Sequence, residues 1–280
     1  VMKKLGFDYG KASELNPKII YCSISGYGQT GPYKNYAGHD INYLGYAGIL
    51  DMTGDKDGFP SIPGVQISDI ASGGMLALIA ILIAFVDLNG TGKGQYIDIS
   101  MFDGNMSQLY AVLGDYFATN IVPTRGNSAV SRILGGYACY SIYKTKDDKF
   151  ITVAPLEEKF WKNLCSKLGR EDLIEIQFNV EKQPEMKAIL QNIFVQKTRN
   201  EWLKEFEGLD VCVGPVNTLE EAVNDPHAIS RNMITELDHP KLGSVSQIGI
   251  PIKFSRSKGE LRSPSPNLGQ HTEEITKKYV

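Results

Sequence analysis

The chain has few cysteines, and their spacing excludes two common structural uses. Its 280 residues contain four cysteines, Cys22, Cys139, Cys165 and Cys212, with no Cys-x-x-Cys pair. Such scattered thiols disfavour both a zinc site and a disulfide framework. His-x3-His and His-Glu-x-x-His motifs are also missing from the sequence, so metal chemistry is not expected. We therefore predict reduced thiols, a cytoplasmic protein and no bound metal.

A basic excess and long apolar runs are missing as well. The chain has 29 Lys and Arg against 32 Asp and Glu, and its net charge is -3. Because nucleic-acid-binding surfaces are normally basic, a nucleic acid is not an expected partner. The longest apolar run, residues 75–86, is shorter than the roughly 20 residues that a membrane-spanning helix needs. This run predicts a buried helix, and no membrane partner is expected.

The first residues resemble the interior of a domain. Residues 1–15 have a helical pattern, Asn16 and Pro17 end it, and residues 18–25 form an apolar strand pattern. No strand pattern comes before this segment, and a strand cannot leave both of its edges without partners. We therefore expect that part of an α/β domain precedes Val1.

Hydrophobic periodicity divides the chain into four parts. Residues 1–101 mix helical and strand patterns and predict the remainder of a large α/β domain, and residues 102–136 predict a helical linker. From 137 to 225, a hairpin around residues 146–149 and later helical stretches predict a small α+β domain. Residues 226–280 are rich in proline and carry little core of their own. This last part is predicted to return and pack on the large domain.

Two glycine-rich stretches are similar to nucleotide-binding loops but lack their context. Residues 26–31 read GYGQTG after a predicted strand, yet Pro32 and a further loop follow instead of a helix. Residues 90–94 read GTGKG and lack the spacing and the Ser/Thr of a P-loop. We interpret both stretches as tight turns. A Gly-x-Ser-x-Gly elbow is also missing, which disfavours a serine hydrolase.

Three residues are candidates for acid–base chemistry: His39, Asp69 and Glu157. His39 precedes a predicted helix, where it is either a hydrogen-bonded structural histidine or a proton carrier. Asp69 precedes the apolar helix and is either a helix N-cap, a base or a nucleophile, since the helix dipole favours an ionised carboxylate there. Glu157 opens a helix after a strand and by itself would be a first-turn charge. These residues alone leave the alternatives open.

Several motifs taken in order resemble one enzyme family. They are NPKIIYCSISGYGQTGPYKNYAGHDINYLGYAGIL, ISDIASGG, GTGKGQYIDISMFDG and PNLGQHTEEI. Together they are similar to the family III CoA-transferases, and within that family to the α-methylacyl-CoA racemases. The resemblance implies an α/β fold with a Rossmann-like large domain, whose N-terminal half is missing here, and a small α+β domain. It also implies an interlocked homodimer with the active site between domains of different subunits.

The resemblance also implies roles for the three candidate residues. In the racemases, a histidine and an aspartate at the positions of His39 and Asp69 flank the α-carbon of the acyl thioester. One of them removes the α-proton and the other returns a proton on the opposite face, through an enolate. Glu157 matches a glutamate that pairs with the histidine and orients its ring. The implied substrate is a 2-methylacyl-CoA, with no cofactor beyond its CoA moiety.

The same family implies an alternative reaction. CoA-transferases keep the aspartate as a nucleophile that attacks the thioester. They usually carry another residue in place of the histidine, so the Gly-His-Asp of this chain favours the racemase. However, racemases have an asparagine four residues before the aspartate, where this chain has Val65. A CoA-binding module without catalysis is a third hypothesis, which the presence of His39, Asp69 and Glu157 together disfavours.

CoA contacts are also implied by the resemblance. Lys4 matches a basic residue that meets the CoA phosphates, although a solvated helix lysine is an equally plain interpretation. The segment around the histidine matches residues that line the pantetheine and thioester. In this chain they are Gly38, Asp40, Ile41, Asn42 and Tyr43.

Overall fold

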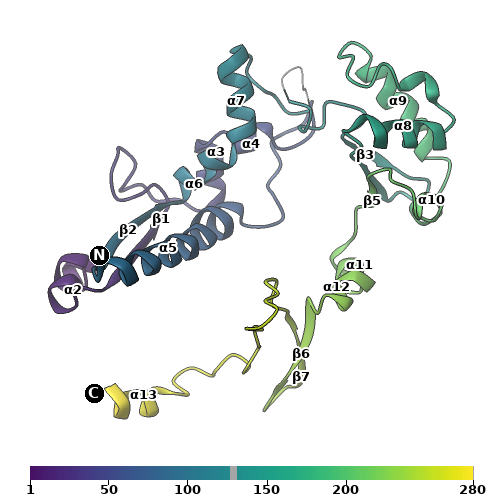
Figure 1. The fold of residues 1–280 in the computed structure, drawn as a ribbon. Helices are drawn as coiled ribbons and strands as arrows, with labels where there is room; N and C mark the ends of the chain where they lie inside the picture. Colours follow the sequence, from purple (N-terminus) through teal and green to yellow (C-terminus); the bar gives the residue numbers. More distant parts are fainter. Residues whose placement is uncertain (127–130, 280) are drawn as a thin grey trace. The chain divides into compact units, whose positions relative to one another are not determined.

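The structure is a computed structural model that describes residues 1–126 and 131–279. The chain divides into two compact units, Val1–Pro215 and Val216–Val280. Figure 1 shows the path of the chain through both. The first unit contains all nine residues to which the sequence assigned a catalytic or binding role. The predicted domain boundaries at 101, 136 and 225 stay predictions.

A parallel strand pair supports the first part of this unit. β1 (Ile20–Ser25) pairs with β2 (Gln95–Ser100) over six residues, with Ile20 opposite Gln95. The strand predicted at 18–25 is therefore confirmed, and its partner comes from later in the chain. Two short helices, α1 (Met2–Leu5) and α2 (Tyr9–Leu15), precede β1. Parallel strands need a long crossover, and here the crossover carries the candidate site.

The crossover begins with two short helices where the sequence predicted one. α3 (Asp40–Tyr46) and α4 (Ile49–Met52) are separated at Gly48, which has φ 82°. A left-handed residue cannot continue a right-handed helix, and glycine adopts this conformation without a steric penalty. The break explains why the helix predicted after His39 is divided.

One long helical segment completes the crossover. It starts as a π-helix, η1 (Ser68–Met75), and continues as α5 (Leu76–Thr91) to Gly92, which is left-handed. Figure 1 shows α5 running along β1 and β2. The buried positions of the segment are small residues, Ser68, Ser72, Gly73, Ala77 and Ala84. A stripe of small residues lets the helix approach its neighbours closely.

The apolar run was predicted to form a buried helix, and the prediction of burial is wrong. The run is helical, but its large side chains are exposed, including Leu82, Ile83, Phe85 and Val86. The reason is that the helix packs through its small residues and is apolar on every face. Residues 68–91 are also long and apolar enough to span a membrane. Core helices of globular proteins meet the same criterion, so the expectation of no membrane contact stays a prediction.

Two helices follow β2. α6 (Met101–Gln108) is capped by Ser100, whose Oγ accepts a hydrogen bond from the backbone N–H of Asp103 at 3.2 Å. α7 (Tyr110–Thr119) follows after a break at Leu109. The helical character predicted for residues 102–136 is thus confirmed as far as Thr119, as two helices. α6 packs on η1 and α3, which brings three separate segments of the chain together.

An antiparallel sheet and three helices form the rest of the first unit. β3 (Ser141–Lys144), β4 (Phe150–Val153) and β5 (Val213–Pro215) pair in that order. The helices are α8 (Glu158–Lys167), α9 (Gln183–Phe194) and α10 (Arg199–Phe206), with a 3-10 turn η2 (Glu171–Leu173). Their shared core runs from Tyr137 to Val211 and is centred on Trp161 and Phe194. The predicted hairpin and helices are confirmed here.

This core buries two of the thiols, and burial raises the pKa of both. Cys139 and Cys165 are buried, and burial, followed by the charges of Asp172 and Glu171, raises the pKa of Cys165 to about 12. At neutral pH its thiolate fraction is then about a thousandfold below that of a thiol with pKa 9.0. We expect iodoacetamide to label exposed Cys212 long before Cys165 in the native protein, as followed by peptide mass spectrometry. Equal labelling rates without denaturant would show that this core is not formed.

The second unit has little buried surface. It contains α11 (Leu219–Val223), α12 (Pro226–Ser230), an antiparallel pair β6 (Ile234–His239) and β7 (Gly243–Ile248), and α13 (Thr272–Tyr279). Residues 250–271 between β7 and α13 have no regular helix or strand. The expectation that residues 226–280 have little core of their own is confirmed for the described residues, which are mostly exposed. Their packing on the large domain stays a prediction.

Candidate functional site

His39 lies at the start of α3. It is the N-cap residue of that helix, with extended backbone angles of φ -128° and ψ 176°. Its backbone N–H donates to Asn42 Oδ1 at 3.0 Å, so the Asn42 side chain holds the start of the helix. The His39 side chain is exposed. The loop-to-helix position predicted for it is confirmed, and an exposed imidazole there is accessible to a substrate.

Asp69 lies in the first turn of η1, two residues after the N-cap Ile67. One interpretation of the sequence made it the N-cap, but the helical backbone begins earlier. Its side chain is exposed, and its backbone N–H donates to the carboxylate of Asp40 at 3.0 Å. A π-helix leaves its first N–H groups without partners, and a carboxylate from another segment satisfies one of them here. π-Helical turns of this kind occur frequently at functional sites.

Asp40 joins the two candidate catalytic residues. It follows His39 directly, and it is only 7% exposed. One oxygen of its carboxylate accepts the Asp69 N–H, and its backbone carbonyl accepts the hydroxyl of Ser68 at 3.2 Å. These bonds connect residues 29 and 28 positions apart in the sequence. The backbone segments that carry His39 and Asp69 are therefore held together, with both side chains exposed.

Tyr43 fixes the loop in front of His39. The ring packs on Gly26 and Gly38, where a Cβ would come within 2.3 Å and 2.8 Å of Tyr43 Cε1. The hydroxyl donates to the carbonyl of Gly38. Burial raises the pKa of Tyr43, and the charges of Asp69 and Asp40 raise the pKa further. The phenol thus stays protonated, and the two glycines are required by its position.

A tyrosine cluster surrounds this loop, and sequence reasoning did not predict it. The ring of Tyr27 lies 5.1 Å from that of Tyr43 and 5.4 Å from that of Tyr46, both edge to face. Tyr33 and Tyr36 complete the cluster. Gly28 and Gly31 have φ 81° and 79°, which confirms the predicted tight turns. Five tyrosines in 20 residues was the available signal.

A buried polar chain runs behind the site, and it was missed as well. Asn105 on α6 donates to Ser68 Oγ at 2.9 Å and accepts from Ser72 Oγ at 2.7 Å. Gln108 donates to Ser72 Oγ at 2.6 Å. The signal in the sequence was a set of polar residues on faces of otherwise apolar helices. Since such groups are costly to bury unless hydrogen-bonded, this arrangement is specific.

Glu157 and Lys4 lie apart from these contacts. Glu157 is the N-cap of α8, one residue before the first-turn position expected, and its side chain is exposed. Burial raises the pKa of Cys212, and the charge of Glu157 raises the pKa further, which makes Cys212 its neighbour. Within residues 1–126 and 131–279, no hydrogen bond or ion pair joins Glu157 to His39 or Asp69. Lys4 is exposed on α1. The roles assigned to these two residues stay predictions, as do those of His39, Asp69 and the segment from Gly38 to Tyr43.

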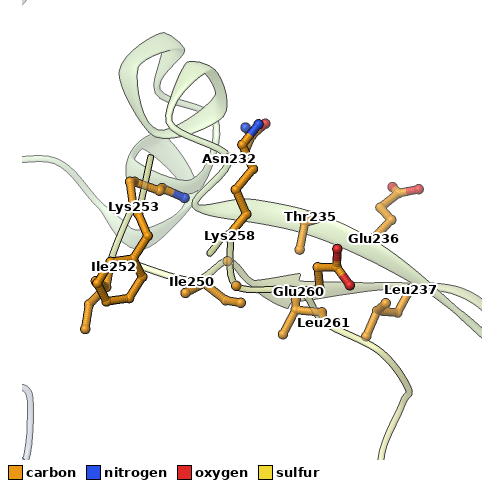
Figure 2. Close-up of a pocket in the computed structure, with 13 residues that line it drawn as sticks. Asn232, Thr235, Glu236, Leu237, Ile250, Ile252, Lys253, Lys258, Glu260 and Leu261 are labelled. Atoms are coloured by element: carbon orange, nitrogen blue, oxygen red, sulfur yellow. The ribbon is translucent and has the colours of Figure 1, made fainter. Parts of the chain in front are cut away.

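Two cavities lie elsewhere in the described residues. One of about 500 Å³ is in the second unit, between β6 and residues 250–261. Figure 2 shows its mixed lining of apolar side chains with Glu236, Glu260, Lys253 and Lys258. Another, of about 580 Å³, is lined by residues of the first unit that include Lys187 but neither His39 nor Asp69. Among the residues that the structure describes, no group of three or more His, Cys, Asp or Glu could hold a metal ion.

These features define a mixed α/β protein in whose parallel crossover the helix starts that carry His39 and Asp69 are joined through Asp40. The family model for CoA-transferase family III matches residues 1–272. The chain belongs to this family. A solved structure of a CaiB/BaiF family protein from Brucella suis is similar over 99% of this chain and 72% of that one, with a TM-score of 0.81 and 32% identity.

Relatives with two different activities are similar to the chain to nearly the same degree. Over its whole length, it is 33% identical to human alpha-methylacyl-CoA racemase and 31% identical to mouse succinyl-CoA:glutarate CoA-transferase. It spans 72% of the length of the first and 64% of the second. The identities alone therefore do not distinguish a racemase from a transferase.

Proposed function

We propose that the chain is part of an acyl-CoA enzyme that inverts the α-carbon of a 2-methylacyl-CoA thioester. The observation that carries this proposal is the bond from Asp69 N–H to the Asp40 carboxylate, next to His39. It supports a pair of proton-transferring groups held at a fixed separation, with both side chains exposed. A reaction that takes a proton from one face of a carbon and returns one to the other requires such a pair.

Each residue has a role in the proposed mechanism. The α-proton of a thioester is weakly acidic, so its removal needs a positioned base and stabilisation of the enolate oxygen. Asp69 lies in the first turn of a long helix, whose dipole favours a negative charge. His39 serves the opposite face as an imidazole. For the other enantiomer, the two residues exchange the roles of base and acid.

The remaining assignments extend this proposal. Lys4 would bind CoA phosphates, and Gly38 to Tyr43 would line the pantetheine and thioester. The buried Asp40 carboxylate would act there through Asp69 rather than through a direct substrate contact. Glu157 would orient His39 across an interlocked homodimer, in which the active site lies between domains of different subunits. A cytoplasmic location and no cofactor beyond the CoA moiety complete the proposal.

The alternative is a CoA-transferase with Asp69 as the nucleophile. Two observations favour it: the similarity to succinyl-CoA:glutarate CoA-transferase, and Val65 four residues before Asp69. In this reaction, the carboxylate attacks the thioester carbonyl and the CoA thiolate leaves. The same helix start and the same Asp40 contact would support the nucleophile. His39 would then have no proton to transfer.

Solvent exchange distinguishes the two reactions. We expect the full-length protein, incubated with one enantiomer of a 2-methylacyl-CoA in deuterated water, to incorporate deuterium at the α-carbon and to produce both enantiomers. Mass spectrometry and chiral chromatography measure the two changes. Transfer of CoA to an added dicarboxylate without α-deuterium would establish the transferase. Tight binding of the thioester with neither reaction would indicate a binding module without catalysis.

A further inference from the structure

We propose that Asn105 is a positioning residue, which fixes the turn that carries Asp69 relative to the turn that carries His39. This inference rests on the proposed function, because both candidate reactions use Asp69. Asn105 touches neither candidate residue. It acts through Ser68 and Asp40, which connect α6 to the site.

From Ser72 through Asn105 to Ser68 and Asp40, each residue donates a hydrogen bond to the next. Its Nδ2 donates to Ser68 Oγ at 2.9 Å, and the Ser68 hydroxyl donates onward to the carbonyl of Asp40 at 3.2 Å. The Asp40 carboxylate then accepts the Asp69 N–H at 3.0 Å. On its other side, Asn105 Oδ1 accepts from the Ser72 hydroxyl. The amide thus orients two hydroxyls, four residues apart, on the turn that contains Asp69.

The surroundings leave the amide little freedom. Asn105, Ser68 and Ser72 are all 0% exposed. α6 and η1 are in close contact at Gly104, where a Cβ would lie 2.5 Å from Ser72 Cβ. A change of side chain at Asn105 therefore affects Ser68 directly, because α6 and η1 are too closely packed to shift and compensate for it. In a packed interior, polar groups of this kind hold one arrangement rather than several.

The side chain must be an amide for chemical reasons. Ser68 Oγ accepts a hydrogen bond from the Asn105 amide, so its own O–H donates to the carbonyl of Asp40. An aspartate of the same shape would offer an acceptor in place of that donor and would draw the Ser68 proton away from Asp40. The isosteric Asn105→Asp variant therefore breaks the connection without leaving a cavity. Displacing a catalytic group by about 1 Å costs up to about a hundredfold in rate.

The test compares Asn105→Asp with Ser107→Ala in the full-length protein. Ser107 lies on the same helix, and its hydroxyl bonds only locally, to the carbonyl of Gly104 at 2.7 Å. We expect Asn105→Asp to lower kcat about tenfold to a hundredfold, with KM changed less than about twofold, because the substrate contacts remain. Hydrogen exchange at the Asp69 amide should become faster. Ser107→Ala should change none of these quantities.

The outcomes separate this inference from the proposed function. kcat is measured for whichever reaction, α-proton exchange or CoA transfer, the wild-type protein catalyses. An Asn105→Asp variant with wild-type kcat and unchanged Asp69 amide exchange overturns the positioning role, while the proposed function stands. Loss of kcat together with a large rise in KM and a collapsed melting temperature also overturns it, since that pattern shows a structural role only. If the wild-type protein catalyses neither reaction, the proposed function fails, and Asp69 amide exchange alone decides whether Asn105 holds this turn.

Discussion

Replacing His39 with glutamine is expected to reduce racemisation of a 2-methylacyl-CoA by about 10²- to 10⁴-fold. Glutamine is polar and of similar size, but its amide cannot take up or release a proton near neutral pH. The side chain is exposed, and the bond between His39 N–H and Asn42 Oδ1 uses only the backbone of residue 39. The start of α3 should therefore persist in the variant. Binding of the CoA ester, measured by calorimetry, should remain within a few-fold of wild type.

His227→Gln is the matched control for this variant. His227 is also exposed and lies in the first turn of a short helix, α12, after the N-cap Asp225. No proposed step involves it, so its replacement should leave racemisation unchanged. If His39→Gln racemises at the wild-type rate, His39 is not an acid–base residue and the transferase mechanism gains support.

The sequence predicted most of the individual elements because their patterns are local. The strand at 18–25, the hairpin around 146–149 and the helices of the small α+β part each have a clear period or turn signal. The π-helical start of the apolar helix has no such signal, since its i to i+5 bonds depend on neighbours. Nor could a run that is apolar on every face predict which side would be packed. The packed side of α5 carries only the small residues Ala77 and Ala84, which line up as a stripe only in the folded helix.

The candidate site was predicted at the level of residues but not of contacts. His39 and Asp69 were recognisable from their motifs, and both lie at helix starts. The contact that joins them runs through Asp40, whose partner lies 29 residues away. A buried carboxylate bonded to a distant backbone N–H leaves no trace in local periodicity. For the same reason, the neighbours of Asn105 in the sequence could not reveal its role, because it contacts Asp40 only through Ser68.

The two candidate mechanisms require the same scaffold, which explains why similarity does not separate them. Both need Asp69 held in the first turn of the helix, and both need room in front of it for a thioester. The hydrogen bonds around Asp40, Ser68 and Asn105 connect the turn of Asp69 to α3 and α6, which suits the first of these needs. What differs is the fate of the Asp69 carboxylate during turnover. A base receives a proton, whereas a nucleophile forms a covalent bond to the acyl carbon.

Trapping experiments on Asp69 test that difference directly. During turnover of a 2-methylacyl-CoA, added hydroxylamine or borohydride is expected to leave Asp69 unmodified, while solvent deuterium enters the substrate at the α-carbon. In the proposed mechanism His39 serves the opposite face, so proton exchange would complete the reaction without a covalent intermediate. Peptide mass spectrometry of the segment that contains Asp69 measures the first result, and mass spectrometry of the acyl group measures the second.

The nucleophilic mechanism predicts the opposite pair of results. Attack of the Asp69 carboxylate on the thioester carbonyl expels CoA thiolate and leaves an acyl–aspartyl anhydride, which returning CoA converts to an aspartyl thioester. Hydroxylamine would convert either species to a hydroxamate at Asp69, and borohydride would reduce it to an alcohol. Asp69→Asn is the matched control, because its amide can form neither species, and it should also lose α-proton exchange. A mass-shifted Asp69 peptide that is absent from Asp69→Asn, together with an acyl group free of α-deuterium, would overturn the racemase and establish a CoA-transferase.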